Sequence, residues 1–236
     1  MPPPNEPSLE DLIETPSAPG LFDPAVRRDT LTLGAVALGT ALFSIAFADI
    51  PIANAVRVMP DAIRDLANTL THLGKLEYML VAAALFAGIA AWLGRRAWVR
   101  WTLFLLAAQL AAGAVIHLFK FVIGRPRPGM GFGQAMYAPS PFTPGSDFAS
   151  MPSGHSATIA CLAAVLWLRF PRLWPAWIAV AAVISLTRVF TLSHYLSDVF
   201  IGLWIGAAAT LLIHVPMTNA GLLPAPALRK TEDAET

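Results

Sequence analysis

Six long apolar stretches dominate this 236-residue sequence. Each comes near the roughly 20 residues that a helix needs to cross the hydrocarbon core of a bilayer. We place them at residues 31–48, 78–94, 101–121, 153–168, 174–189 and 195–213. Only 13% of the residues are charged, against roughly 25% in a soluble domain. The pattern therefore predicts an all-α, polytopic membrane protein with six transmembrane helices in a bundle.

Lysine and arginine are distributed unevenly over the predicted loops. With six spans both termini lie on one side, and the side richer in these residues is the cytoplasmic one. The side of the termini carries Arg27, Arg28, Arg95, Arg96, Arg100, Arg169, Arg172, Arg229 and Lys230. We therefore expect cytoplasmic termini. The opposite face carries Arg57, Arg64, Lys75, Lys120, Arg125, Arg127 and Arg188, which need another explanation.

The segments outside the spans divide the chain further. Residues 1–29 are acidic and proline-rich, unlike a secretory signal, and we expect a disordered cytoplasmic tail. Residues 60–73 place apolar side chains at helical spacing, which predicts a short amphipathic helix along the outer interface. Residues 30–215 would form the membrane domain and residues 216–236 a cytoplasmic C-terminal tail. Cys161, the one cysteine, is interpreted as a small core residue.

Three polar clusters fall at span ends on the predicted outer face. They read KFVIGRPRPG, MPSGHS and TRVFTLSHYLSD. Their candidate site residues are Lys120, Arg127, Ser153, Gly154, His155, Arg188, His194 and Asp198. Taken singly, most have structural explanations, such as a snorkelling lysine, a helix cap or a helix-stabilising pair. Asp198 is the exception, because an ionisable residue inside a span indicates function.

A phosphate group explains why these residues share one membrane face. Arginine and lysine pair with phosphate oxygens, and a helix N-terminus offers free N–H groups to an anion. Gly154 would let the backbone approach the phosphate, and the Ser153 hydroxyl would donate to it. We therefore interpret five residues as phosphate-binding: Lys120, Arg127, Ser153, Gly154 and Arg188.

The two histidines divide the chemistry between them. His194 precedes Asp198 by four residues, so the carboxylate can hold one ring nitrogen and leave the other as a nucleophile. His155 suits proton donation to the leaving group and then proton abstraction from water. The cations neutralise the phosphoryl oxygens, so this mechanism requires no metal ion and no cofactor.

These residues resemble the signature of the type-2 phosphatidic acid phosphatase superfamily. The matching residues are Lys120, Arg127 and Pro128 of the first motif; Pro152, Ser153, Gly154 and His155 of the second; and Arg188, His194 and Asp198 of the third. Thr187 stands where the family usually has serine, and it keeps the hydroxyl. The resemblance implies six helices with an outward-facing site, a phosphohistidine on His194, His155 as acid and base, and activity without a metal.

Three polar residues lie outside the signature. Arg125 is expected to assist at the phosphate or to bind a lipid head group, and His117 to be packed or interfacial. Asp147 is interpreted as a solvated loop acid, although contact with a head group is the alternative. We expect substrate selectivity to lie in the loop at residues 129–150 and in the helix at residues 60–73.

The predicted function is hydrolysis of a phosphomonoester or diphosphate on a membrane lipid. Phosphatidate, phosphatidylglycerol phosphate, undecaprenyl diphosphate and lipid A all present a phosphate beside an apolar anchor. Two alternatives stay open: a phosphatase of water-soluble esters, and a transporter or binding protein without catalysis. Six spans argue against a soluble vanadium haloperoxidase, and we see no nucleic-acid signature. The expected setting is a bacterial inner membrane with the site on the periplasmic face; the sequence leaves the oligomeric state open.

Overall fold

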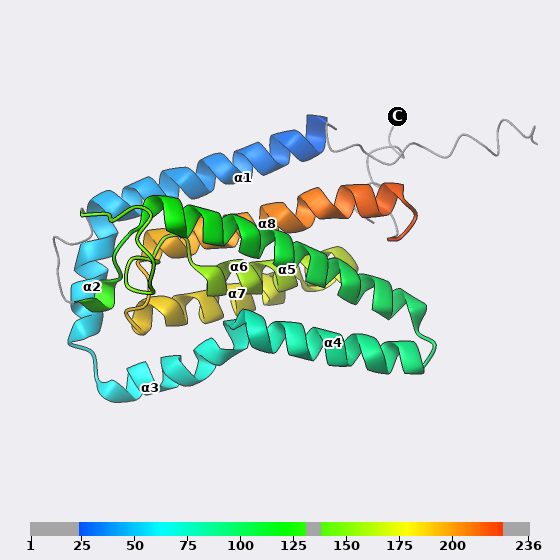
Figure 1. The fold of residues 1–236 in the computed structure, drawn as a ribbon, viewed down its shortest axis with the longest axis horizontal. Coiled ribbons are helices and arrows are strands. Elements are labelled where there is room, and N and C mark those ends of the chain that lie inside the picture. Colours follow the sequence, from blue (N-terminus) through cyan, green and yellow to red (C-terminus); the bar gives the residue numbers. More distant parts are fainter. Residues whose placement is uncertain (1–23, 131–137, 224–236) are drawn as a thin grey trace, which may run out of the picture.

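The computed structural model describes residues 24–130 and 138–223, and within them every regular element is a helix (Figure 1). The predicted tails at 1–23 and 224–236 lie outside the described residues, as does part of the loop at 131–137. The α-helices are α1 (Pro24–Phe43), α2 (Asp49–Arg57), α3 (Asp61–Leu70), α4 (Leu76–Trp92), α5 (Arg96–Ile123), α6 (Gly154–Arg169), α7 (Trp174–Phe190) and α8 (Leu196–Asn219). The all-α class is therefore confirmed.

The number of membrane spans is less clear-cut than the apolar stretches indicated. Within the part of the chain that the structure describes, four helices are long and apolar enough to cross a bilayer; they lie within residues 30–57, 96–130, 171–190 and 196–219. The pair α3 and α4 passes the same test together, with a bend of 46° between them. The remaining predicted span, α6, is an apolar helix of 16 residues. The structure thus supports four or five spans by length and composition, and the sixth rests on α6.

Several helix boundaries differ from the predicted ones. Helix α5 runs for 28 residues and begins at Arg96, before the predicted start of the span at residue 101. Helix α8 continues through Pro216 to Asn219, beyond the predicted end of the span at residue 213. Pro216 is tolerated because it lacks only one backbone N–H donor, and that donor lies near the end of the helix.

The first apolar stretch does not end at Ala48. A π-helix, Ser44–Ala48, joins α1 to α2, and the chain turns there so that α2 crosses one end of the bundle (Figure 1). Pro51 lacks the N–H that a regular α-helix would use to bond back to residue 47, which explains why the hydrogen-bond ladder is interrupted here. The turn brings Asp49, which is 1% exposed, into the interior of the protein.

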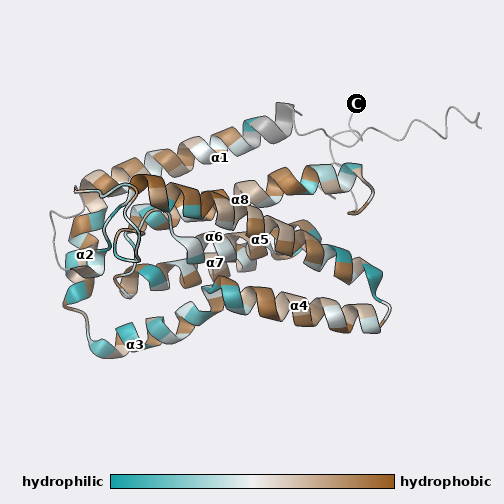
Figure 2. Ribbon diagram, in the orientation of Figure 1, coloured by the Kyte–Doolittle hydropathy of each residue, from teal (hydrophilic) through white to brown (hydrophobic). Residues whose placement is uncertain are grey.

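Helix α8 lies at the centre of the bundle and contacts α1, α5, α6 and α7. The main core cluster joins α5, α6 and α8 through large and small side chains in alternation, such as Phe104, Ala108, Cys161 and Ile205. Cys161 is fully buried, which confirms its interpretation as a core residue. Many large apolar side chains are exposed on the outside of the helices, as expected for a lipid-facing surface. Figure 2 shows that hydrophobic residues predominate along the long helices.

The two ends of the bundle carry different parts of the chain. The start of α1, the end of α8 and the α4–α5 turn lie at one end (Figure 1). The end of α5, the start of α6 and the α7–α8 turn lie at the other, together with α2. The three polar motifs of the sequence therefore meet at a single end.

Close packing of α8 on α6 depends on glycine at position 206. A Cβ there would overlap the carbonyl oxygen of Ala157 and press on the Ala160 side chain. We expect Gly206→Ala to destabilise the fold by about 1–3 kcal/mol, as overpacking does in other cores. Thermal unfolding in detergent measures the effect. Gly39→Ala on the outer face of α1 is the matched control, because its Cβ would meet no atom within 4 Å; equal melting temperatures for the two variants would contradict the prediction.

Candidate active site

Lys120 lies in the last turn of α5 and belongs to the first motif. Gly124 ends that helix in the left-handed conformation, with φ of 58°, and its N–H donates to the Lys120 carbonyl at 2.9 Å. A side chain at Gly124 would also overlap the carbonyl oxygen of Ser140, so there is no space for one at this position. Glycine is therefore required for the chain to leave α5 and enter the Arg125–Pro128 segment.

The second motif forms the N-terminus of α6, as predicted. Ser153 is the N-cap: its Oγ accepts hydrogen bonds from Ser156 N at 3.4 Å and from Ser156 Oγ at 2.9 Å. The Ser153 carbonyl accepts from Ala157 N. The first N–H groups of a helix have no partners within the helix. At this end, the backbone N–H groups of Gly154 and His155 are therefore available to bind an anion.

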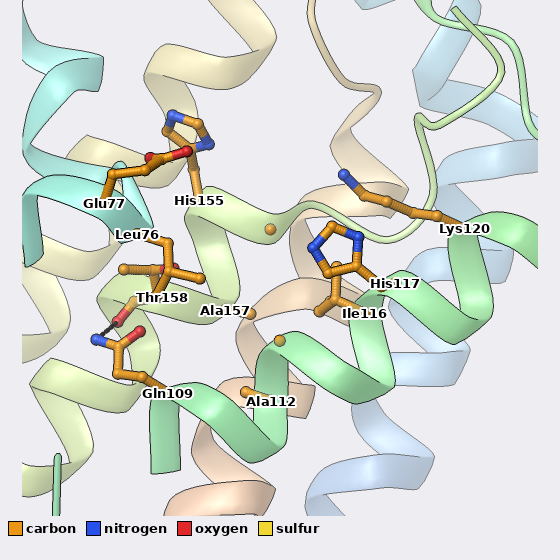
Figure 3. Close-up of a pocket in the computed structure, with 12 residues that line it drawn as sticks. Leu76, Glu77, Gln109, Ala112, Ile116, His117, Lys120, His155, Ala157 and Thr158 are labelled. Carbon is orange, nitrogen blue, oxygen red and sulfur yellow. Dashed lines mark hydrogen bonds between the residues drawn. The ribbon is translucent and has the colours of Figure 1, made fainter. Parts of the chain in front are cut away.

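Lys120 and Gly154 are neighbours in space. The Lys120 Nζ lies 3.9 Å from the position that a Cβ on Gly154 would occupy. Helices α4, α5 and α6 line a pocket of about 180 Å³. Figure 3 shows the Lys120 ammonium group beside His117 on one side of it and the His155 ring beside the Glu77 carboxylate on the other. The pocket continues along α5 past Ile116 to Gln109, whose buried Oε1 has no hydrogen-bond partner among the described residues. One of its ends is thus polar, with a lysine, two histidines and a glutamate, and its walls are largely apolar.

His194 is 2% exposed and lies in the turn before α8. Its Nδ1 is 2.6 Å from the Ser150 carbonyl oxygen and 3.6 Å from Asp198 Oδ2. A carbonyl only accepts hydrogen bonds, so Nδ1 carries the proton and Nε2 keeps its lone pair. Burial lowers the pKa of His194 to about 4, although Asp198 acts in the opposite direction. The ring is therefore neutral at neutral pH, as a nucleophile must be.

His194 and Asp198 are close in space, but His194 lies outside the helix that carries Asp198. The two residues do not share a turn of helix, because α8 begins after Tyr195. Asp198 is in the first turn instead, where its Oδ2 accepts from Tyr195 N at 2.9 Å and from Ser150 Oγ at 2.5 Å. Ser150 thus touches both members of the pair, with its carbonyl on the histidine and its hydroxyl on the acid.

Arg188 lies in the last turn of α7 and is 9% exposed. Its Nη1 donates to Thr71 Oγ1 at 2.8 Å, while its buried Nε has no partner among the described residues. The Arg188 carbonyl accepts from His194 N at 3.1 Å and so ties the third motif together. Thr187 directs its hydroxyl to the Ile184 carbonyl at 2.6 Å, so the exchange of serine for threonine keeps that bond within α7.

His155 is half-buried in the first turn of α6. Its ring packs near Gly74, and its Nε2 is buried without a partner among the described residues. Arg127 is also half-buried, and its Nε donates to the Ser146 carbonyl at 2.7 Å. Asp147 is exposed, in keeping with a solvated loop acid, and its carbonyl accepts from Arg127 N.

Arg125 has a different place from the one expected. It is 5% exposed and forms ion pairs with Asp198 and Asp49, so its guanidinium faces two carboxylates rather than a phosphate. Sequence reasoning also missed Asp49 and Ser150. An acid at the end of an apolar stretch was a usable signal for Asp49; Ser150, a loop serine, gave none.

The fold and site together define a class: an integral membrane protein with two histidines, an acid and several cations collected at one end of a helical bundle. Among residues 24–130 and 138–223, no group of three or more His, Cys, Asp or Glu side chains is arranged to hold a metal ion.

Comparison with known proteins identifies the family. The chain belongs to the PAP2 superfamily, whose model matches residues 101–221. It is 33% identical over 204 residues to proteins named lipid A 1-phosphatase from Rhizobium etli and Rhizobium johnstonii. These alignments cover 82% of this chain and 85% and 81% of the two relatives. The protein is thus a phosphoric ester hydrolase of the membrane.

A solved structure supports the fold. It is described as the first transmembrane PAP2 type phosphatidylglycerolphosphate phosphatase from Bacillus subtilis. The TM-score is 0.61 with 23% sequence identity, covering 78% of this chain and 94% of the other. At this identity the likeness concerns the helical arrangement.

Proposed function

We propose that this protein removes a phosphate group from lipid A or a closely related membrane glycolipid. The observation that carries the proposal is the pocket between α4, α5 and α6, whose polar end holds the Lys120 ammonium group and the His155 ring beside largely apolar walls. A lipid phosphate needs both features, because its head group is anionic and its anchor apolar. Relatives named lipid A 1-phosphatase along four fifths of the chain favour lipid A over the other candidate lipids.

The proposed reaction passes through a phosphohistidine. The Nε2 lone pair of His194 attacks phosphorus, and the bond between phosphorus and the lipid oxygen breaks. His155, protonated, gives its proton to that oxygen, which leaves as an alcohol. His155 then takes a proton from water, whose oxygen attacks phosphorus and breaks the P–N bond. Inorganic phosphate leaves, and both histidines return to their starting states.

The remaining site residues stabilise the charge on the phosphoryl oxygens. Lys120, Arg127 and Arg188 supply positive charge, and the α6 N-terminus at Ser153 and Gly154 supplies hydrogen-bond donors. Asp198 and the Ser150 carbonyl hold the His194 ring by its Nδ1 side while positive charge develops on it. In this scheme the protein's own cations take the part that a metal ion plays in other phosphatases.

We also propose a bacterial inner-membrane protein with six spans and both termini in the cytoplasm. Arg95 before α5, Arg96 at the start of α5 and Arg169 at the end of α6 lie at the end of the bundle opposite the site, which favours that orientation. Residues 30–215 would form the membrane domain, with α6 as its shortest span. A helix of 16 residues is about 24 Å long, shorter than the roughly 30 Å hydrocarbon core. With its other end at the cytoplasmic boundary, its N-terminus would lie within the outer leaflet, about 6 Å below the boundary between hydrocarbon and head groups.

Phosphate release from a substrate panel tests the proposal. Purified protein in detergent, with a chelator present, is given lipid A, phosphatidate, phosphatidylglycerol phosphate, undecaprenyl diphosphate and glucosamine 1-phosphate. We expect release from lipid A and little from glucosamine 1-phosphate, which has a similar head group without acyl chains. Equal release from the soluble ester would overturn a lipid phosphatase, and preference for another lipid would overturn the substrate.

A further inference from the structure

A buried charge network connects the first apolar stretch to the active site. Each carboxylate oxygen of Asp49 accepts two hydrogen bonds. Oδ1 accepts from Ser44 Oγ at 2.6 Å and from Ser197 N at 3.1 Å. Its Oδ2 accepts from Arg125 Nη2 at 2.8 Å and Ser197 Oγ at 2.5 Å. Asp49 is 1% exposed, so these partners hold a carboxylate that water does not reach.

Arg125 forms the middle of the network. While Nη2 binds Asp49, Nη1 donates to Asp198 Oδ1 and to Ser197 Oγ, the latter at 2.7 Å. The guanidinium also lies over the Tyr195 ring, 4.3 Å from its centroid. A planar fork held on two sides and on one face has little freedom to turn. Arg125 therefore fixes the position of the Asp198 carboxylate from the side opposite His194.

The second carboxylate changes what Arg125 does to Asp198. An arginine paired with Asp198 alone would balance its charge and draw the carboxylate away from the histidine. Two carboxylates around one guanidinium leave a net negative charge. That charge faces His194, 3.6 Å from Asp198, where positive charge develops as the ring attacks phosphorus.

We propose that Asp49 is a positioning residue for catalysis, acting through Arg125 on Asp198 and His194. It lies outside residues 101–221, which the family model matches, on the helix that follows the π-helix. A π-turn in a helix often marks a functional site, and here it brings Asp49 to Arg125. The first apolar stretch thus contributes to the reaction as well as to the membrane anchor.

The proposal rests on the proposed phosphatase reaction and is tested with the full-length protein in detergent. The variant is Asp49→Asn, with lipid A as substrate, or whichever lipid the panel identifies. We expect kcat to fall about 10–100-fold, as displacement of reacting groups does, with KM within about twofold of wild type. Such a split shows that an interaction of the transition state is lost, because substrate binding is unchanged.

A control separates positioning from stability. Ile205→Ala leaves a cavity in the core of α8 without touching the network, and it should lower the melting temperature with kcat nearly unchanged. If Asp49→Asn does not fold, Ser197→Ala provides a milder change, since Ser197 Oγ joins Asp49 to Arg125. We expect Ser197→Ala to reduce kcat by about 3–10-fold on the same argument.

Binding of orthovanadate provides a second test that does not depend on turnover, because vanadate bound to the nucleophile resembles the transition state. Calorimetry should show weaker vanadate binding by Asp49→Asn, with binding of inorganic phosphate unchanged. An unchanged kcat, or an equal loss of phosphate binding, would overturn the role of Asp49 while leaving the phosphatase proposal standing. If wild type cleaves no lipid, the phosphatase proposal fails, and the comparison of vanadate binding still decides the role of Asp49.

Discussion

Replacement of His194 with alanine abolishes phosphate release and leaves the protein folded, if His194 is the nucleophile. The expected loss in kcat is about 10⁴-fold or more, because removal of a nucleophile leaves only binding and charge stabilisation. The ring is buried, with Nδ1 bound to Ser150 and Nε2 free to attack. Phosphate release by purified variant and wild type, with melting temperatures for both, measures the effect.

His214→Ala is the matched control for that experiment. His214 is also a buried histidine of the α8 region, but it stacks with Trp101 and lies near the opposite end of the helix. Its loss should change stability and leave kcat close to wild type. Undiminished turnover by His194→Ala would refute the phosphohistidine mechanism, and equal losses in both variants would indicate a general effect on folding.

Replacement of Arg125 with methionine has the largest expected effect on stability. Methionine keeps much of the side-chain volume but leaves the carboxylates of Asp49 and Asp198 buried beside each other without a cation. Breaking a buried ion pair in this way destabilises a protein by about 3–5 kcal/mol. Thermal unfolding in detergent should therefore show a marked loss of stability, and phosphate release should be lost with it.

Arg127→Met is the control variant for this experiment. Arg127 is half-buried and hydrogen-bonds a loop carbonyl, so its loss uncovers no buried carboxylate pair. The variant should melt near the wild-type temperature and show a raised KM, because a phosphate-binding cation is gone. A normal melting temperature for Arg125→Met would mean that the Asp49–Arg125–Asp198 network does not support the fold.

Much of the site could be read from the sequence because its residues lie at fixed places on helices. Lys120 lies in the last turn of one helix, Ser153 caps the next, and Arg188 lies in the last turn of a third. Hydrophobic length predicts where such helices start and stop, so polar residues at those points fall at the membrane surface. Helix α6 confirms this closely, since it was predicted to start at residue 153 and begins at Gly154.

Other contacts depended on how distant segments pack. Arg125 and Arg127 occupy the same short stretch of sequence, yet one is buried between two acids and the other is half-exposed. The two side chains point to different surroundings because the chain turns after Gly124, and the spacing of residues in the sequence does not reveal that turn. Ser150 likewise reaches both His194 and Asp198 only because its loop returns to the start of α8.

The sequence alone determined that this is a helical membrane protein, which end of each helix carries polar chemistry, and that a phosphate is the group recognised. Those conclusions rest on hydrophobic length, helix ends and residue types, which are local properties of the chain. Tertiary structure decided which cation meets which acid, including the 76 residues that separate Asp49 from Arg125. Buried charges must find partners wherever packing places them, and that pairing is a property of the folded bundle.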